Sequence, residues 1–108
     1  MPGHKNPPLT PLLQVSTKGV ARGPLIDSVV LDPQKEYKVD GVLRIRNTTS
    51  TVDPQRRGVS IIAGSEESPL FHESLFFDGK DKVTIEYGSQ KIVVSGSEDY
   101  AITIEVRL

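Results

Sequence analysis

Apolar and polar residues alternate with a period of two along most of the chain that follows its N-terminal arm. The clearest run is at the C-terminal end, where one face carries Tyr100, Ile102, Ile104, Val106 and Leu108 and the other carries Ala101, Thr103, Glu105 and Arg107. Such alternation is typical of a β-strand with one side in the core. The same pattern sets Val83, Ile85 and Tyr87 against Lys82, Thr84 and Glu86, and Tyr37, Val39, Leu43 and Ile45 against Lys38, Asp40, Arg44 and Arg46. No segment keeps helical apolar spacing over three turns, so the pattern predicts an all-β fold.

Short clusters of turn residues separate the alternating segments. Gly88-Ser89 stands between two of them, and glycine at the first central position favours a type II′ hairpin turn. The runs 96–99 and 78–81 also have loop compositions, so residues 70–107 predict an antiparallel meander of four strands. Further strands are predicted near residues 12–17, 25–31, 36–46 and 58–63, with turns at Asp32-Pro33 and Asp53-Pro54. About eight short strands separated by turns favour an antiparallel β-sandwich or jelly roll.

The N-terminal arm has a different character, because four of the eight prolines fall within the first eleven residues. Each proline removes a backbone N–H and fixes φ, which excludes a helix interior or an internal strand. We therefore divide the chain into an extended arm, residues 1–24, and a β-sandwich domain, residues 25–108. A polyproline II conformation is expected for the arm, and ordering it on binding costs little further entropy. Its expected interface residues are Pro7, Pro8, Leu9, Pro11, Leu12 and Leu13; the alternative is a leader with no binding role.

Composition limits the chemistry and the location of the protein. The 108 residues suit one domain, and the absence of cysteine excludes disulfides, thiol nucleophiles and cysteine-based zinc sites. A net charge of −1 argues against a nucleic acid or a membrane surface as the main partner. The chain has no apolar run long enough for a signal peptide or a membrane span. The expected location is the virion if the protein is viral and the cytoplasm otherwise.

Candidate catalytic and metal-binding residues are few. His72 and Ser74 share one strand face while Glu73 points to the other, so this neighbouring set does not build a catalytic triad. His4 is the only other histidine, and the run 78–81 is too short and too rich in lysine for a calcium loop of the EF-hand type. We therefore expect no enzymatic activity, no cofactor and no metal.

Arginines form the clearest candidate binding surface. Arg44 and Arg46 lie on one strand face, and Arg56 and Arg57 follow in the polar stretch 47–57. Guanidinium groups bind carboxylates and phosphates in bidentate fashion, so Arg56 and Arg57 are predicted interface residues for a protein partner. A face of solvated charges is the alternative. Nucleic acid is not expected, because the aromatic residues needed for base stacking are assigned to the core: Phe71, Phe76, Phe77 and Tyr87.

The chain resembles the small decoration or cement proteins of tailed-phage capsids and related head and tail accessory proteins. The features that carry the resemblance are the proline-rich arm from Met1 to Pro11, the cysteine-free β body from Leu12 to Leu108 and the lack of a secretion signal. The resemblance is one of architecture. It implies a β-rich subunit, often trimeric, that lies over junctions of capsid subunits and helps them resist internal pressure.

The leading hypothesis is therefore a non-enzymatic structural protein that assembles with copies of itself, or with a larger protein lattice such as a capsid, through its arm and the 47–57 loop. The alternative is a glycan- or peptide-binding β-sandwich module used in host attachment. Glycan sites commonly present an exposed aromatic platform, whereas this chain has no tryptophan and its three tyrosines, Tyr37, Tyr87 and Tyr100, all fall on predicted apolar faces.

Overall fold

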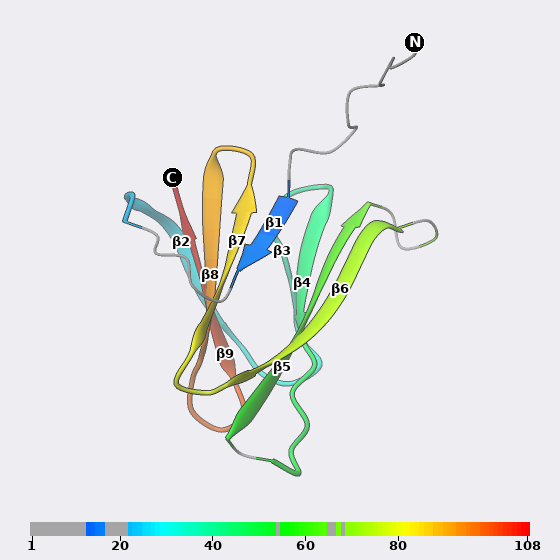
Figure 1. Cartoon of the computed structure of the whole chain (residues 1–108), viewed down its shortest axis with the longest axis vertical. Coiled ribbons are helices and arrows are strands. Elements are labelled where there is room, and N and C mark those ends of the chain that lie inside the picture. The colour runs from blue at the N-terminus through cyan, green and yellow to red at the C-terminus, as the bar shows by residue number, and fades with distance from the viewer. Residues whose placement is uncertain (1–12, 17–21, 54, 65–66, 68) are drawn as a thin grey trace.

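The computed structural model describes residues 13–16, 22–53, 55–64, 67 and 69–108. They form strands Leu13–Ser16 (β1), Leu25–Leu31 (β2), Glu36–Lys38 (β3), Leu43–Asn47 (β4), Arg56–Gly64 (β5), Pro69–Asp78 (β6), Lys82–Tyr87 (β7), Gln90–Gly96 (β8) and Ile102–Arg107 (β9). A five-stranded sheet has the order β1-β7-β8-β9-β2, and a four-stranded sheet has the order β3-β4-β5-β6. All pairings are antiparallel, and the two sheets are the layers of a β-sandwich (Figure 1). The predicted fold class is confirmed.

The hairpin turn predicted between β7 and β8 is present. Tyr87 pairs with Gln90, which leaves Gly88 and Ser89 as the two turn residues. Gly88 has φ of 61°, as the first central position of a type II′ turn requires. The next loop, between β8 and β9, carries two left-handed residues, Asp99 with φ of 53° and Tyr100 with φ of 67°. Tyr100 therefore lies in the loop before β9 and not in the strand to which the alternation assigned it.

The expected four-stranded meander over residues 70–107 is wrong in one respect. β6 pairs with β5 in the four-stranded sheet, whereas β7, β8 and β9 belong to the other layer. The turn after β6, closed by a hydrogen bond of 2.8 Å from Asp81 N–H to the Asp78 carbonyl, carries the chain from one sheet to the other. Turn composition reports only a local change of direction, so it does not reveal which layer the next strand joins.

The segment 36–46, expected as one strand, is a hairpin of β3 and β4, which raises the number of described strands to nine. Tyr37 pairs with Ile45 across it. The Asp40 carboxylate stabilises the reversal, because it accepts hydrogen bonds from the backbone N–H groups of Val42 at 2.7 Å and Leu43 at 2.8 Å. Asp followed by Gly is a hairpin signal, and here it outweighs the apolar alternation on either side.

The core lies between the two layers and consists of the inward residues of nearly every strand. Its fully enclosed members include Leu43, Ile45, Val59, Ile61, Val83, Ile85, Ile92, Val94, Ile102 and Ile104. Phe77 is buried as expected, and Phe71 packs against the core from a partly buried position. The assignment of Phe76 to the core is wrong, because its side chain is 66% exposed. Successive strand residues point to opposite faces, so only one of two adjacent phenylalanines can face inward.

β1 pairs with β7 from Leu13 opposite Tyr87 to Ser16 opposite Thr84, so the five-stranded sheet includes residues that the sequence assigned to the 1–24 arm. Residues 1–12 lie outside the described part of the chain. Among the described residues, no helix has the length and apolar character needed to cross a membrane.

Candidate interaction surface

The outer face of the four-stranded sheet, meaning the side chains that point away from the core, is the candidate functional surface. Its residues lie in rows across the strands: Arg46, Ser60 and Ser74 are opposite one another on β4, β5 and β6, and so are Arg44, Ile62 and His72. The face is basic over β4, whereas β6 carries an exposed apolar residue near each end, Leu70 at 59% and Phe76 at 66%, with the polar residues His72 and Ser74 between them.

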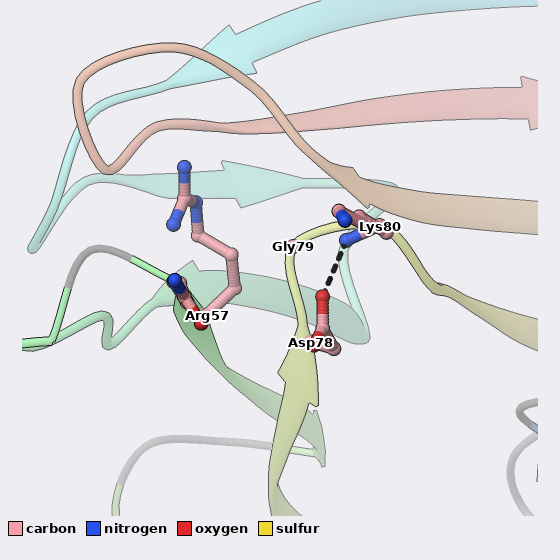
Figure 2. A pocket seen from close by; sticks show the side chains of 5 residues that line it. Arg57, Asp78, Gly79 and Lys80 are labelled. Carbon is pink, nitrogen blue, oxygen red and sulfur yellow. Dashed lines mark hydrogen bonds between the residues drawn. The ribbon is translucent and has the colours of Figure 1, made fainter.

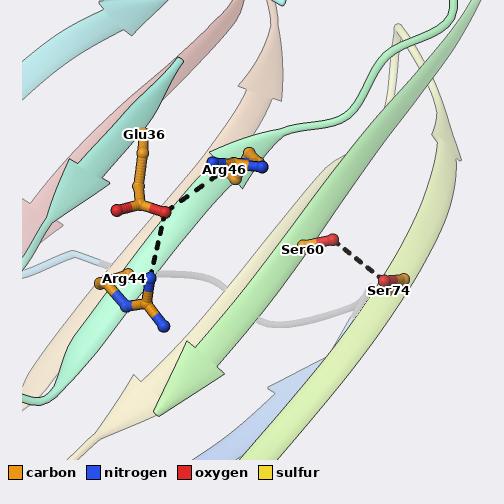
Figure 3. Close-up of polar contacts among 5 residues, drawn as sticks. All are labelled: Glu36, Arg44, Arg46, Ser60 and Ser74. Carbon is orange, nitrogen blue, oxygen red and sulfur yellow. Dashed lines mark hydrogen bonds and ion pairs between the residues drawn. The ribbon is translucent and has the colours of Figure 1, made fainter. Parts of the chain in front are cut away.

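Arg44 and Arg46 share this face as predicted, and a carboxylate from β3 lies between them (Figure 3). Glu36 Oε2 is 3.4 Å from Arg44 Nη1 and 3.8 Å from Arg46 Nε. The side chain of Arg44 is 12% exposed and that of Arg46 is 47% exposed. Arg44 is thus occupied within the sheet, whereas Arg46 presents its charge to the solvent. An anion arriving at this cluster would compete with Glu36.

Polar residues on β5 and β6 form a second contact on the same face. The hydroxyls of Ser60 and Ser74 lie 3.0 Å apart and share a hydrogen bond (Figure 3). His72 and Ser74 are both exposed, and Glu73 points to the opposite face, as the strand period requires. The residues that could suggest a triad are therefore kept on two different faces.

Arg56 and Phe76 lie together at the end of the face near the β6–β7 turn. The Arg56 guanidinium carbon is 5.6 Å from the centroid of the Phe76 ring, within the range of a cation–π interaction. Both side chains are exposed, so the predicted interface residue Arg56 is at the surface. The sequence does not reveal its aromatic neighbour, because Gly58, rather than Arg56, pairs with Phe76.

Arg57 is in a different position from its neighbour. The placement of both arginines in a polar loop is wrong, because β5 begins at Arg56. Arg57 lies in β5 and is 7% exposed. Its Nε donates to the Ala101 carbonyl at 3.0 Å and its Nη2 to the Ser97 carbonyl at 2.6 Å. The guanidinium therefore joins the four-stranded sheet to the β8–β9 loop of the other layer. Its strand position gives it the inward parity of the core residues that follow.

A pocket of about 300 Å³ lies beside Arg57 and is also lined by Gln55, Asp78, Gly79 and Lys80 (Figure 2). The Asp78 carboxylate accepts a hydrogen bond of 2.9 Å from the Lys80 backbone N–H, which orders the β6–β7 turn at the rim. Gly79 also donates its N–H to the Gln55 carbonyl at 2.7 Å. The Arg57 guanidinium, the Asp78 carboxylate and the Gln55 carbonyl at this pocket are thus engaged in hydrogen bonds within the chain, and the pocket is the space beside the β6–β7 turn.

Two tyrosine hydroxyls that the sequence placed on apolar faces donate to aspartates across the sandwich. Tyr87 of β7 donates to Asp40 at 2.9 Å, and Tyr37 of β3 donates to Asp27 of β2 at 2.6 Å. Burial, followed by the hydrogen bond and the nearby negative charge, raises the pKa of each tyrosine to about 12. Burial alone would raise the pKa of Asp40, but hydrogen bonds from Leu43, Val42 and Tyr87 hold it below its usual value.

Asn47 completes these links between the layers and is fully buried. Its side-chain nitrogen donates to the carbonyl of Leu31 at 2.9 Å and to that of Tyr100 at 3.0 Å, and its oxygen accepts from Thr49 N–H at 2.9 Å. The sequence placed Asn47 at the start of a polar loop, with no signal that it enters the core. In the described part of the chain, no buried side-chain nitrogen or oxygen lacks a hydrogen-bond partner.

The predicted interface residues of the arm, Pro7, Pro8, Leu9, Pro11 and Leu12, lie outside the described residues. Leu13 is the first residue of β1. Within the described ranges, no group of three or more histidine, aspartate or glutamate residues is placed to hold a metal ion. Comparison of the chain with known protein families, with curated proteins and with solved structures finds no match.

Proposed function

We propose that the protein is a non-enzymatic structural protein that works by binding other protein subunits through the outer face of its four-stranded sheet. The single observation that carries this proposal is the exposed pair of Arg56 and Phe76 on an open sheet face. Aromatic and arginine side chains dominate the energetics of protein interfaces because they bury much area and also make directed polar contacts.

The rest of the face supports the same use. Leu70 adds a second exposed apolar side chain, and the half-exposed Arg46 adds a charge that a partner carboxylate can reach. A face with exposed apolar residues near both ends of one strand and arginines on another suits a flat protein surface better than a small ligand, which requires a concave site. The polar groups that link the two layers, such as Asn47 and Arg57, tie the backbone of the four-stranded sheet to the other layer, so the strands that carry this face are held in place before binding.

The finer assignment, a virion accessory protein such as a capsid decoration protein, rests on the architectural resemblance. It adds the N-terminal arm as a second contact, through Leu9 and Leu12, and a capsid lattice as the partner.

The assembly role is tested by gradient sedimentation of the full-length protein in lysates of the cells that naturally make it. An assembly protein sediments with particles far larger than its own 11.8 kDa. Phe76→Ala is expected to weaken this association about tenfold or more, and Arg56→Ala somewhat less and mainly at low salt. Val30→Ala is the matched control, because Val30 is also an exposed apolar residue, at 58%, but lies in the other sheet.

The proposal is wrong if the wild-type protein sediments alone, or if both variants at the outer face remain bound like the control. The arm is tested separately by replacing Leu9 and Leu12 with serine in the full chain. Unchanged sedimentation of that variant with its particle would contradict a contact through the arm.

A further inference from the structure

β6 is the longest strand and an edge strand, with ten residues and a single partner, β5, among the described strands. The other edges are short or modified. β3 has three residues and β1 has four. β2 has a register shift between Leu25 and Asp27, and the Asp27 carboxylate takes up the N–H of Ser28 at 2.9 Å. β6 also has a register shift, at its Pro69 end, but its pairing with β5 is regular from Phe71 to Asp78. A long regular edge is a template for pairing with another strand.

The hydrogen-bond pattern identifies the backbone groups on the free side of β6. Gly58 accepts from Thr48 of the β4 side, and Gly64 donates to Val42 on that side. Even-numbered residues of β5 therefore bond toward β4, and odd-numbered residues bond toward β6, as the hydrogen bond from Gly79 to Gln55 also indicates.

On β6, the partners of those odd-numbered residues are Phe71, Glu73, Leu75 and Phe77. The N–H and C=O groups of His72, Ser74 and Phe76 consequently point away from β5, and no described residue pairs with them. The same three residues are exposed. A register shift at the Pro69 end of β6 interrupts the regular pairing with β5 there, whereas the middle of the strand is regular.

The sequence of this edge has the symmetry needed to pair with itself. From Leu70 to Phe76 it reads Leu-Phe-His-Glu-Ser-Leu-Phe: two apolar residues, a polar residue, a glutamate, a polar residue and two apolar residues. Reversing the direction preserves the order of residue classes, and Glu73 is the centre. Two antiparallel copies centred there bring like classes together at every position.

We propose that two copies of the chain pair their β6 edges antiparallel about a two-fold axis at Glu73, joining the four-stranded sheets into one continuous sheet. His72 then pairs with Ser74 of the second copy, and these two central pairs form about four backbone hydrogen bonds. Leu70 meets Phe76 of the second copy on the outer face, and Phe71 meets Leu75 of the second copy on the inner face. The proposal rests on the assembly function above and names a second copy as one partner.

Glu73 moderates the strength of this contact. On the axis it lies directly opposite Glu73 of the second copy, and like charges in a cross-strand pair are destabilising. The apolar pairs at both ends favour association of the two copies, and the central pair of glutamates opposes it. The dimer is therefore expected to dissociate reversibly. Glu73→Gln is expected to tighten the dimer roughly two- to fivefold.

Disulfide trapping tests the pairing and its register, because the chain has no cysteine of its own. Residues on the axis form a non-hydrogen-bonded pair with Cα atoms about 4.5 Å apart, within reach of a disulfide. Glu73→Cys is expected to give a covalent dimer under mild oxidation. His72→Cys and Ser74→Cys are matched controls, because each of those residues lies about 8 Å from its own copy, beyond disulfide reach.

A second variant tests the backbone pairing in solution. His72→Pro removes a backbone N–H on the side of β6 that faces away from β5. An edge strand tolerates this loss, so the variant is expected to be folded by circular dichroism and monomeric by sedimentation equilibrium.

Two results would overturn the proposal. One is a disulfide yield for Glu73→Cys that is no higher than the yields of the two control variants, and the other is a His72→Pro variant that dimerises like the wild type. If the protein sediments with its particle while Glu73→Cys is not trapped, the edge pairing is wrong and the assembly function stands. If the dimer is trapped but the protein does not sediment with a particle, the edge pairing stands and the assembly function is wrong.

Discussion

At the scale of single residues, two adjacent arginines show how strand parity assigns different roles to the same side chain. Arg56 points outward and covers the ring of Phe76. Arg57 points inward and donates to two main-chain carbonyls of the β8–β9 loop, those of Ala101 and Ser97. The sequence grouped the pair as interface residues because nothing local distinguishes them. The difference depends on where β5 begins, which its pairing with β6 determines.

Substituting each of the two neighbouring arginines with alanine is expected to change the stability of the protein by very different amounts. Arg57→Ala removes the side-chain donor to the Ser97 carbonyl and one of the two donors to the Ala101 carbonyl, which keeps the Ser97 N–H at 2.9 Å. It is expected to lower the free energy of unfolding by roughly 1–3 kcal/mol. Arg56→Ala removes an exposed side chain and is expected to change it by no more than about 0.5 kcal/mol. Urea denaturation of the two variants beside the wild type measures both values. Equal midpoints for the two variants would show that the Arg57 hydrogen bonds contribute nothing.

At the scale of elements, β8 ends against the turn that follows β6. A Cβ placed on Gly96 would lie 2.7 Å from the Gly79 carbonyl oxygen and 3.0 Å from its Cα, both of them backbone atoms. Since neither can move as a side chain moves, Gly96→Ala is expected to cost about 1–3 kcal/mol. Gly41→Ala is the control, because nothing lies within 4 Å of its Cβ position. It should be neutral or stabilising by up to about 1 kcal/mol. Thermal melts compare the two, and a neutral Gly96→Ala would mean that the turn and the strand end shift apart freely.

The elements also show how far the alternation of residues can be extended into a fold. It predicted strands at nearly all the observed places, because one inward side chain in two is a local property of a half-buried strand. It joined β3 and β4, since Tyr37 and Ile45 share an inner face on either side of the Asp40 turn. It also left β6 in the wrong layer, because sheet membership depends on partners far along the chain.

At the scale of the whole molecule, the candidate surface was predicted only in part. The common face of Arg44 and Arg46 follows from strand period, but Glu36 reaches them only through the β3–β4 pairing. Exposure of Phe76 could have been predicted from the adjacent phenylalanines, since a strand buries one of two neighbours. The edge of β6 that pairs with no described strand could not be predicted, because the sequence does not give strand order. Polar residues expected at the surface instead hold the layers together, as Asn47 does.

The two tyrosine–aspartate hydrogen bonds join the sheets at separate places, so they predict how the sandwich responds to alkali. Tyr87 has a pKa of about 12 in the folded protein against 10.0 for a free tyrosine, and Tyr37 is shifted alike. A folded-state pKa above the unfolded value means that the folded state holds its proton more tightly. The resulting stability is fully present below pH 10 and is lost as the pH rises from about 10 to 12.

The loss is expected to reach about 2 kcal/mol for Tyr87, which is buried, and less for Tyr37, whose partner Asp27 is exposed to solvent. Urea denaturation at intervals from pH 8 to pH 12 measures it. The double variant Tyr37→Phe and Tyr87→Phe is the control: it should be less stable than the wild type at pH 8, because Asp40 and Asp27 lose their donors, and the difference should shrink as the pH passes 10. A difference that stays constant to pH 12 would show that the tyrosine protons do not link the two layers, since lysine titration affects both proteins equally.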